Sequence, residues 1–404
     1  MQSRRCEFMN NFYERKYVPL FLVIYFFLTA SHVVGFFVSN GILAIVLFII
    51  FFGYLSLYGL AKKYLLAFFF IISIGMLCSF FSGNYEGSLN LIYFSMMLII
   101  ISNVSFSELE KAIDIISDIL LVVLFLALIS LIYKSFGGQP LAEFKNPDGR
   151  PNYLMLTSFS NANYLYFMRP SGIFDEPGAL SFHCCACVFS RCALKRKFDN
   201  KSTLIVLFGF VTLSLAHFVF AFFYFMIFLF SIREVKSIVK IVIVFLVFII
   251  SLYILYDFDS QAKTIIDYFL SRFSYSSSSG FSGNSRGGSF ENAYNAINDK
   301  NILLGLYQDS CYLSNSCSAV YGDYKQNFLS PLVVHGLIVS FLYYIPFFFI
   351  LFVSLLRLNF LALAFLLLWI QRPYFITVGY TFWFVLFIFL TCYRKGYRVN
   401  RYFL

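Results

Sequence analysis

Charged side chains are scarce in this 404-residue sequence. Asp, Glu, Lys and Arg together make up 12% of it, whereas a soluble domain carries about 25%. Apolar residues reach 60% and aromatic residues 22%. No water-facing surface can be built from so little charge. The composition therefore predicts an integral membrane protein.

A metal-binding spacing of cysteines is also missing. The nine cysteines are scattered and form no pair of Cys-x-x-Cys units. One group resembles a ligand set, namely His183, Cys184, Cys185, Cys187 and Cys192. These residues share a single apolar run, and no other segment supplies the remaining ligands. We expect neither a metal site nor a cofactor.

Long apolar runs are what the sequence does contain. Most are close to the roughly 20 residues with which an α-helix crosses a bilayer while satisfying its own backbone. The runs cover 18–38, 41–60, 64–82, 88–104, 112–133, 178–194, 202–214, 216–231, 238–256, 328–356, 358–371 and 375–392. We predict an all-α, polytopic transmembrane helical bundle of about 12 spans, forming one integral membrane domain over residues 1–404.

The basic residues predict the topology. A net charge of +10 indicates cytoplasmic loops rich in Lys and Arg rather than nucleic-acid binding. The stretch 202–230 decides the orientation, because as one helix it would separate Lys195–Lys197 from Arg233, Lys236 and Lys240. Two short spans return both clusters to one side. With that split, both termini lie in the cytoplasm of a multi-pass inner-membrane protein.

Two long loops, about 134–177 and about 257–327, then share the non-cytoplasmic face. Loops of this length usually carry function. The second contains a helical pattern at 265–273, a Ser/Gly stretch at 274–288 and another helical pattern from 290 to 297. Cys311 and Cys317 lie close together in the same loop, so an oxidising compartment favours a small structural disulfide between them.

The first long loop ends with acidic residues just before an apolar run. Two interpretations of Asp175, Glu176 and Arg169 remain open and are compatible. In the first, Pro177 begins a helix and Glu176 interacts favourably with its N-terminus. In the second, a carboxylate acts as a general base and an arginine binds an anion beside the membrane.

Candidate anion-binding residues follow in both loops. Arg272 and Arg286 flank the Ser/Gly stretch, where they belong either to a solvated linker or to a site that grips a pyrophosphate bidentately. Arg150 in the first loop is a further candidate for substrate binding. His335 opens an apolar run beside the second loop, and ionisable groups in membranes are candidates for function by default.

The run Arg-Pro-Ser-Gly-Ile-Phe-Asp-Glu-Pro-Gly at 169–178 resembles a motif of the bacterial O-antigen polymerase (Wzy) family. Arg286 with the helix after it, and Asn-Ile-Leu-Leu-Gly at 301–305, are similar to that family's second periplasmic loop. Asn-Phe-Leu at 327–329 and Gly-Leu-Ile at 336–338 resemble its return into the membrane. The resemblance extends over nearly the whole chain.

This resemblance implies a metal-independent glycosyltransferase with a GT-C-like fold. Such an enzyme joins oligosaccharide repeat units carried on undecaprenyl pyrophosphate at the periplasmic face, in lipopolysaccharide biosynthesis. Arg169 and Arg286, helped by Arg272, would hold the donor pyrophosphate, while Glu176 or Asp175 accepts the proton of the attacking hydroxyl. Membrane lipid surrounds such a protein, and a chain-length regulator and a flippase are its expected partners.

The sequence also departs from the family pattern. Arg272 and Gly283 fit an Arg-x10-Gly spacing, but Arg169 has no matching glycine. O-antigen ligases, which move finished polymer to the lipid A core, place a histidine where this chain has Gln326-Asn327. That difference favours a polymerase over a ligase. A flippase or another transporter is the alternative from a different class, although the chain has no internal repeat of the kind many transporters show.

Overall fold

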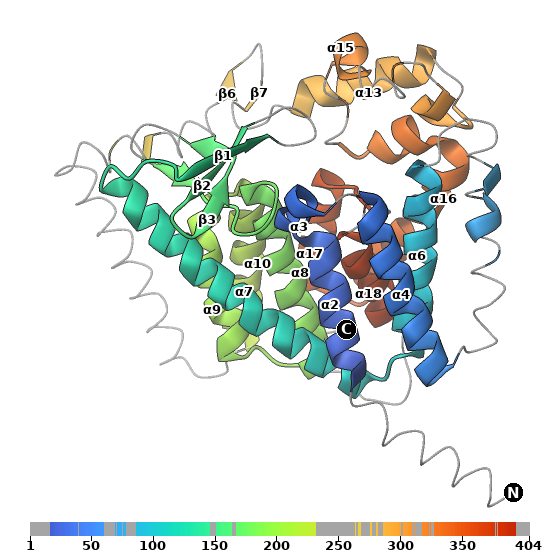
Figure 1. The fold of residues 1–404 in the computed structure, drawn as a ribbon, viewed down its shortest axis with the longest axis horizontal. Coiled ribbons are helices and arrows are strands. Elements are labelled where there is room, and N and C mark those ends of the chain that lie inside the picture. The colour runs from blue at the N-terminus through green and yellow to red at the C-terminus, as the bar shows by residue number, and fades with distance from the viewer. Residues whose placement is uncertain are drawn as a thin grey trace, which may run out of the picture.

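The computed structural model describes most of the chain, in segments separated by gaps. They are residues 17–38, 40–59, 69, 71–74, 76–77, 86–145, 151–163, 167–231, 263, 266–267, 275–276, 280–281, 286–299, 302–308, 311, 317–322, 324, 327–375, 377 and 379–392. The fold is mostly helical with little sheet. Figure 1 shows a helix bundle that carries the strands, α13 and α15 at one end.

The first apolar run forms two helices instead of one continuous span. α2 (Val18–Ala30) ends where Ser31 takes an extended backbone conformation, and α3 (His32–Phe37) follows. The break is held from outside the run, because the His32 amide donates to the carbonyl oxygen of Ile173 at 2.9 Å. The segment that precedes α8 is therefore fastened to the junction of α2 and α3.

α4, α6 and α7 follow in the described segments up to residue 135. α4 (Asn40–Tyr58) and α6 (Glu86–Asn103) cover predicted apolar runs. α7 (Phe106–Ser135) starts with a capping box, in which Ser105 and Glu108 each accept from the other's backbone amide. This pair satisfies amides that a helix N-terminus otherwise leaves without partners. The predicted run 64–82 lies largely outside the described residues.

The first long loop contains strands, a feature that the prediction of an all-α fold did not include. β1 (Ala142–Lys145), β2 (Pro151–Met155) and β3 (Ser158–Ser160) form an antiparallel sheet in the order β1-β2-β3. β4 (Ala162–Asn163) pairs with β5 (Met168–Arg169). Pairing through the backbone satisfies peptide groups. The chain after β5 lies against β3, where the Phe159 amide donates to the carbonyl of Gly172 and the Ser171 amide donates to the carbonyl of Phe159.

α8 (Pro177–Lys195) lies in the middle of the bundle. Every residue from Ala179 to Ala193 is buried, and the helix contacts α7, α9, α10, α17 and α18. Its sequence is rich in Ala, Ser and Cys. Small side chains allow neighbouring helices to approach closely, so α8 can be surrounded on all sides.

The chain reverses direction between two helices of the stretch 202–230, as the predicted split into two short spans requires. α9 (Asn200–Gly209) leads through the short helix η3 (Phe210–Thr212) into α10 (Leu215–Ser231). His217 Nε2 donates to the carbonyl of Val206 at 2.8 Å, and the hydroxyls of Thr203 and Tyr224 lie 3.0 Å apart. The residue nearer the start of α9, Thr203, pairs with the residue farther along α10, Tyr224. The two helices therefore form an antiparallel hairpin.

The second long loop carries α13 (Arg286–Asp299), the short helix η4 (Gly305–Gln308) and α15 (Cys317–Tyr321), with β6 (Tyr275–Ser276) and β7 (Gly280–Phe281) before them. The expected disulfide joins Cys311 to Cys317. A small hydrophobic cluster under α13 includes this disulfide, Ala293, Ala296 and Tyr324. The helical pattern predicted at 290–297 is confirmed, and that at 265–273 lies mostly outside the described residues.

α16 (Ser330–Leu356) returns the chain to the bundle and is interrupted at Gly336. Gly336 and Gly305 both have positive φ angles, and their backbones lie too close together for a side chain on either. The amide of Leu337 donates to the carbonyl of Ile302 at 2.8 Å. This close approach attaches the second long loop to the top of α16.

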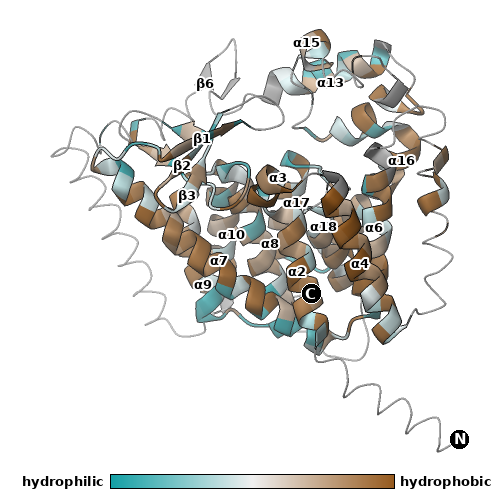
Figure 2. Cartoon of the chain, in the orientation of Figure 1, coloured by the Kyte–Doolittle hydropathy of each residue, from teal (hydrophilic) through white to brown (hydrophobic). Residues whose placement is uncertain are grey.

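The bundle ends with α17 (Phe360–Gln371) and α18 (Thr381–Cys392). Figure 2 shows hydrophobic residues along the helices and hydrophilic residues gathered towards the two ends of the bundle. By length and composition, α7 and α16 could each cross a membrane, and the other apolar helices of the described segments are shorter. The predicted run 238–256 lies outside the described residues.

Candidate functional site

An ion pair marks the start of α8. Glu176 occupies the N-cap position, and Pro177 is the first residue of the helix, as one sequence-based interpretation predicted. The carboxylate of Glu176 forms an ion pair with the guanidinium of Arg372, which directly follows α17. Both side chains are mostly shielded, with 17% and 11% of their surfaces exposed. The ion pair therefore fixes the end of the first long loop against the connection between α17 and α18.

Gly178 makes room for this ion pair. A Cβ atom at position 178 would collide with the guanidinium of Arg372. The backbone of Gly178 has no unusual φ angle, so the need for glycine here is one of space rather than of conformation. Each residue of the Glu-Pro-Gly run thus has a structural role. Glu176 supplies the charge, Pro177 begins the helix, and Gly178 leaves space for the guanidinium of Arg372.

Asp175 lines a cavity of about 350 Å³ beside the ion pair. The walls come from the junction of α2 and α3, from α4 and α6, and from the segment that precedes α18. Its polar lining includes Asp175, Tyr380, Tyr93, Asn90, Thr377 and His32. Ligand pockets in proteins usually have volumes of about 300–1,000 Å³, so the cavity is large enough for a small ligand group.

Tyr380 links the cavity to the ion pair. It lines the cavity, and its hydroxyl accepts a hydrogen bond from Arg372 Nη1 at 3.4 Å. The side chain of Arg372 thus interacts with Glu176 and Tyr380 together. Arg372 therefore connects the start of α8 to a residue that lines the cavity.

His183 packs beside the segment that contains Asp175 and Glu176. Trp383 Nε1 donates to His183 Nδ1 at 2.8 Å, and the His183 ring stacks on Phe174 with 4.4 Å between ring centres. Phe174 is fully buried and immediately precedes Asp175. The packing of the buried Phe174 against His183 therefore restricts the position of Asp175.

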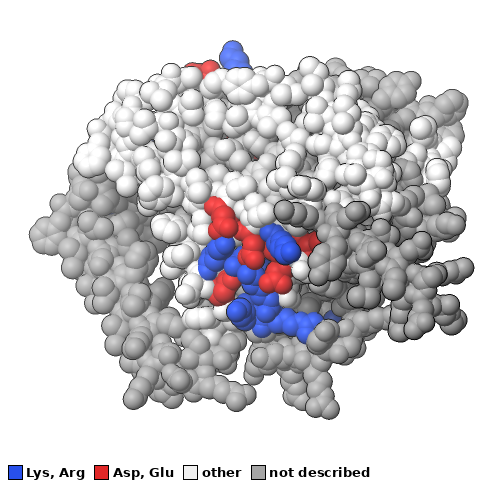
Figure 3. Space-filling model, turned by 60° about the horizontal axis from the view of Figure 1, so that its bottom comes forward, with Lys and Arg blue, Asp and Glu red and all other residues white. Residues whose placement is uncertain are grey.

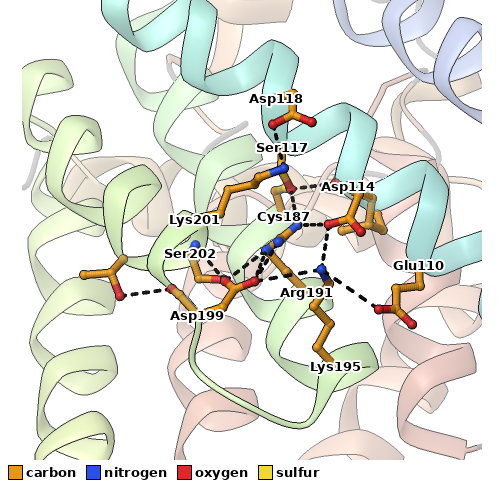
Figure 4. Close-up of polar contacts among 12 residues, drawn as sticks. Glu110, Asp114, Ser117, Asp118, Cys187, Arg191, Lys195, Asp199, Lys201 and Ser202 are labelled. Atoms are coloured by element: carbon orange, nitrogen blue, oxygen red, sulfur yellow. Dashed lines mark hydrogen bonds and ion pairs between the residues drawn. The ribbon is translucent and has the colours of Figure 1, made fainter.

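A network of charged residues lies at the opposite end of α8. Arg191 donates from Nε and Nη2 to Asp199 Oδ2 at 2.8 and 2.6 Å, and it also forms an ion pair with Asp114 of α7. Lys195 lies 2.8 Å from Asp114. Figure 4 shows these contacts converging from α7, α8 and α9, and Figure 3 shows the patch on the underside of the molecule.

Asp199 is the electrostatic centre of this network. Burial alone would raise the pKa of its carboxyl group, but hydrogen bonds from Arg191 and Ser202 outweigh burial and hold that pKa well below its usual range. Asp199 also caps α9, since it accepts from the Ser202 amide at 2.9 Å. The network holds the ends of three helices together, and its charges are compensated by one another.

The other predicted site residues have separate locations. Arg169 lies in β5, and its Nε donates to the carbonyl of Thr212 at 3.3 Å. His335 lies in α16, just before the interruption at Gly336, and its ring packs against Phe375. Arg286 is the first residue of α13. Arg150 and Arg272 lie outside the described residues.

Arg372 was not among the predicted site residues. Its signal in the sequence is an arginine between apolar runs, in Gln371-Arg372-Pro373, and an ionisable group in such a place is a candidate for function. The sequence could not identify Glu176 as its partner, because the two residues come from opposite halves of the chain. The structure brings them together.

The cysteines of α8 have protein neighbours. Cys187 Sγ lies 3.2 Å from the Ser117 hydroxyl, and Cys185 Sγ lies 3.5 Å from His217 Nδ1. Within the described segments, no group of three or more His, Cys, Asp or Glu side chains is arranged to hold a metal ion. All four cysteines of α8 are buried, and the two contacts place Cys185 and Cys187 in the packed interior.

Comparison with known proteins identified no relative of this chain. No protein-family model, curated protein or solved structure matches this chain.

Proposed function

We propose that this chain is a multi-pass membrane glycosyltransferase of the O-antigen polymerase type. It joins repeat units carried on undecaprenyl pyrophosphate, at the periplasmic face of the inner membrane, without a metal. Both termini lie in the cytoplasm, and a chain-length regulator and a flippase are its expected partners. In the reaction, the acceptor hydroxyl attacks the anomeric carbon of the donor sugar, and the lipid pyrophosphate leaves.

One observation carries the proposal. Asp175 lines a cavity at the same end of the bundle as the described parts of both long loops (Figure 1). A lipid-linked substrate presents its sugars beside the membrane, so an enzyme for it needs its acidic and basic groups at one such end. The hairpin of α9 and α10 supports this arrangement, because it allows the second long loop to form at the same end of the bundle as the first.

The arginines complete the proposed reaction. Arg286 and Arg272 in the second loop, with Arg169 in the first, hold the donor pyrophosphate, because guanidinium groups bind phosphate oxygens in pairs and stay charged. Stabilising the leaving group in this way replaces the charge that a metal would otherwise supply. Substrate binding by Arg150 and His335 remains part of the proposal.

A deletion strain tests the function. Without a polymerase, the lipopolysaccharide of the strain should show core carrying single repeat units, and an intact copy of the gene should restore the ladder. Core without any repeat unit would instead identify a ligase. Normal delivery of repeat units to the periplasm in the deletion strain is the observation that sets aside a flippase.

Purified protein provides the second test. In vesicles that contain lipid-linked repeat units, it should produce longer chains in the presence of a metal chelator. Arg286→Ala should abolish elongation, and Arg286→Lys should restore little of it because a point charge cannot reproduce a two-pronged contact. Full-length polymer made at the normal rate by Arg286→Ala would refute the role of Arg286.

A further inference from the structure

Asn327 lies where the second long loop ends and the chain enters α16. It is buried, with 6% of its surface exposed. Its backbone carbonyl accepts from the amide of Ser330, the first residue of α16, at 3.1 Å. Its side-chain oxygen accepts from the Leu329 amide at 2.8 Å. Asn327 is therefore fixed to the N-terminal end of α16.

The side-chain nitrogen of Asn327 reaches the start of α13. Nδ2 donates to the carbonyl of Ser289 at 2.9 Å, to Ser289 Oγ at 3.0 Å and to the carbonyl of Tyr324 at 3.0 Å. Carbonyl oxygens only accept, so the atom that faces them must be the nitrogen of the amide. Its two N–H groups are thus used inside the protein. Asn327 holds other residues in place and is not itself a donor to a substrate.

Ser289 belongs to the first turn of α13, which begins at Arg286. It is 1% exposed and lies on the buried side of the helix with Ala293 and Ala296. Three residues separate Ser289 from Arg286, which is less than one helical turn. The first amides of a helix have no partner within it, so an anchor at this end has a large effect. The contact that holds Ser289 therefore also determines where the backbone of Arg286 lies.

Asn327 connects this turn to a helix that is long and apolar enough to cross a membrane. α16 meets that criterion by length and composition, and α13 contacts it (Figure 1). Fastening the start of α13 to the start of α16 places the first turn of α13 at a constant distance from the end of α16. A phosphate group carried on a membrane lipid is also restricted to a narrow range of depths, so a residue that binds it needs such an attachment.

We propose that Asn327 is a positioning residue for Arg286, which it holds so that the guanidinium binds the pyrophosphate of the lipid-linked donor in a fixed orientation. A two-pronged contact between guanidinium and phosphate depends on geometry as well as on charge. A displaced first turn of α13 therefore weakens the contact although the arginine is still present. The identity of the anion rests on the proposed function, whereas the anchoring of α13 by Asn327 does not.

Three variants separate this role from general stability. Asn327→Leu removes the hydrogen bonds of the side chain while keeping its approximate shape and its lack of charge. Ser289→Ala is milder, because it deletes the contact to Oγ and keeps the contact to the Ser289 carbonyl. Asn295→Leu is the matched control, since Asn295 is an exposed residue farther along the same helix.

Hydrogen exchange of the purified protein in detergent tests the anchoring. The amides of residues 290–293 donate to carbonyls of the first turn in an α-helix. They should exchange about 10–100-fold faster in Asn327→Leu, as the loss of two or three hydrogen bonds implies. Ser289→Ala should give a smaller increase, and Asn295→Leu none. Unchanged exchange in Asn327→Leu would overturn the anchoring, and unchanged exchange in Ser289→Ala would do so if Asn327→Leu does not fold.

Calorimetric titration with inorganic pyrophosphate tests the link to Arg286. Asn327→Leu should weaken binding about tenfold, the effect of one lost hydrogen bond to a charged group, and Asn295→Leu should not change it. In the Arg286→Lys protein, which lacks the two-pronged contact, adding Asn327→Leu should cause no further loss. Equal losses in both backgrounds, or unchanged affinity in Asn327→Leu, would overturn the positioning role.

Elongation of lipid-linked repeat units is measured with the same proteins. Asn327→Leu should lower kcat about tenfold with a smaller change in KM, because the charge on the leaving pyrophosphate develops in the transition state. Normal elongation by the wild-type protein with an unchanged kcat in Asn327→Leu would refute the role of Asn327 alone. Pyrophosphate binding that depends on Asn327, in a wild-type protein that elongates nothing, would refute the proposed function alone.

Discussion

Arg372, at the end of α17, forms an ion pair with Glu176, the residue that immediately precedes α8. The contact joins two connections that are far apart along the chain. It also leaves Asp175 on the wall of the adjacent cavity. The stability of this region and the position of Asp175 therefore depend on the same pair of charges. Substituting Glu176 and Arg372, singly and together, measures what the pair contributes to stability.

Removing one charge of this pair should destabilise the protein more than removing both. Glu176→Gln or Arg372→Met leaves a shielded charge without its partner, which costs about 3–5 kcal/mol. The double variant has no such charge and should unfold at a temperature closer to that of the wild-type protein. Thermal unfolding in detergent measures the difference, with Glu143→Gln at an exposed position of β1 as the control. A double variant less stable than either single variant would contradict this prediction.

A methyl group at position 178 should act through Arg372. Gly178→Ala is expected to displace the guanidinium and to lower the free energy of unfolding by about 1–3 kcal/mol, as overpacking usually does. Gly288 in α13 has open space around it, so Gly288→Ala should be neutral or stabilising by about 0.5–1 kcal/mol. Denaturation in detergent compares the two variants. Equal effects of both substitutions would show that Gly178 is not needed to admit Arg372.

The disulfide between Cys311 and Cys317 should stabilise the second loop. Closing so short a loop removes entropy from the unfolded chain worth about 2 kcal/mol. Reduction, or Cys317→Ser, should therefore increase hydrogen exchange in α13 and α15 while leaving α8 unchanged. Maleimide labelling of the native protein checks the bond itself. Labelling of Cys311 before any reduction would be inconsistent with the disulfide.

Stability should depend on pH through Asp199. Its pKa is lowered in the folded protein, so its stabilising contribution is fully present above the unfolded-state value of about 3.9 and is lost as the pH falls towards the native value. Asn is also a good N-cap residue, so Asp199→Asn removes mainly the charge. The gap in melting temperature between wild-type and variant should shrink below about pH 4. A gap that stays constant through this range would refute the prediction.

Much of the helical architecture follows from the apolar runs alone. Each run in the described segments contains a helix, and the reversal between α9 and α10 follows from the distribution of basic residues. The break at Ser31 was not predicted, because it is held by the carbonyl of Ile173, which is remote in sequence. The strands of the first loop were also missed, since β1 to β5 are short and lack a long alternating pattern.

The candidate site was predictable in part. Asp175 and Glu176 stood out because they precede a proline and an apolar run. Their different surroundings could not be predicted, because these depend on Arg372 and on a cavity lined by segments that are far apart in the sequence. Local sequence gives the chemistry of a side chain, whereas its partner depends on how distant helices pack.

The hydrogen bond from Trp383 to His183 has a consequence for how the protein is made. His183 lies in the N-terminal half of α8, but its partner belongs to α18, the last helix that the structure describes. During synthesis, α8 leaves the ribosome long before Trp383 exists. The hydrogen bond between Trp383 and His183 can therefore form only after nearly the whole of the described chain has been translated.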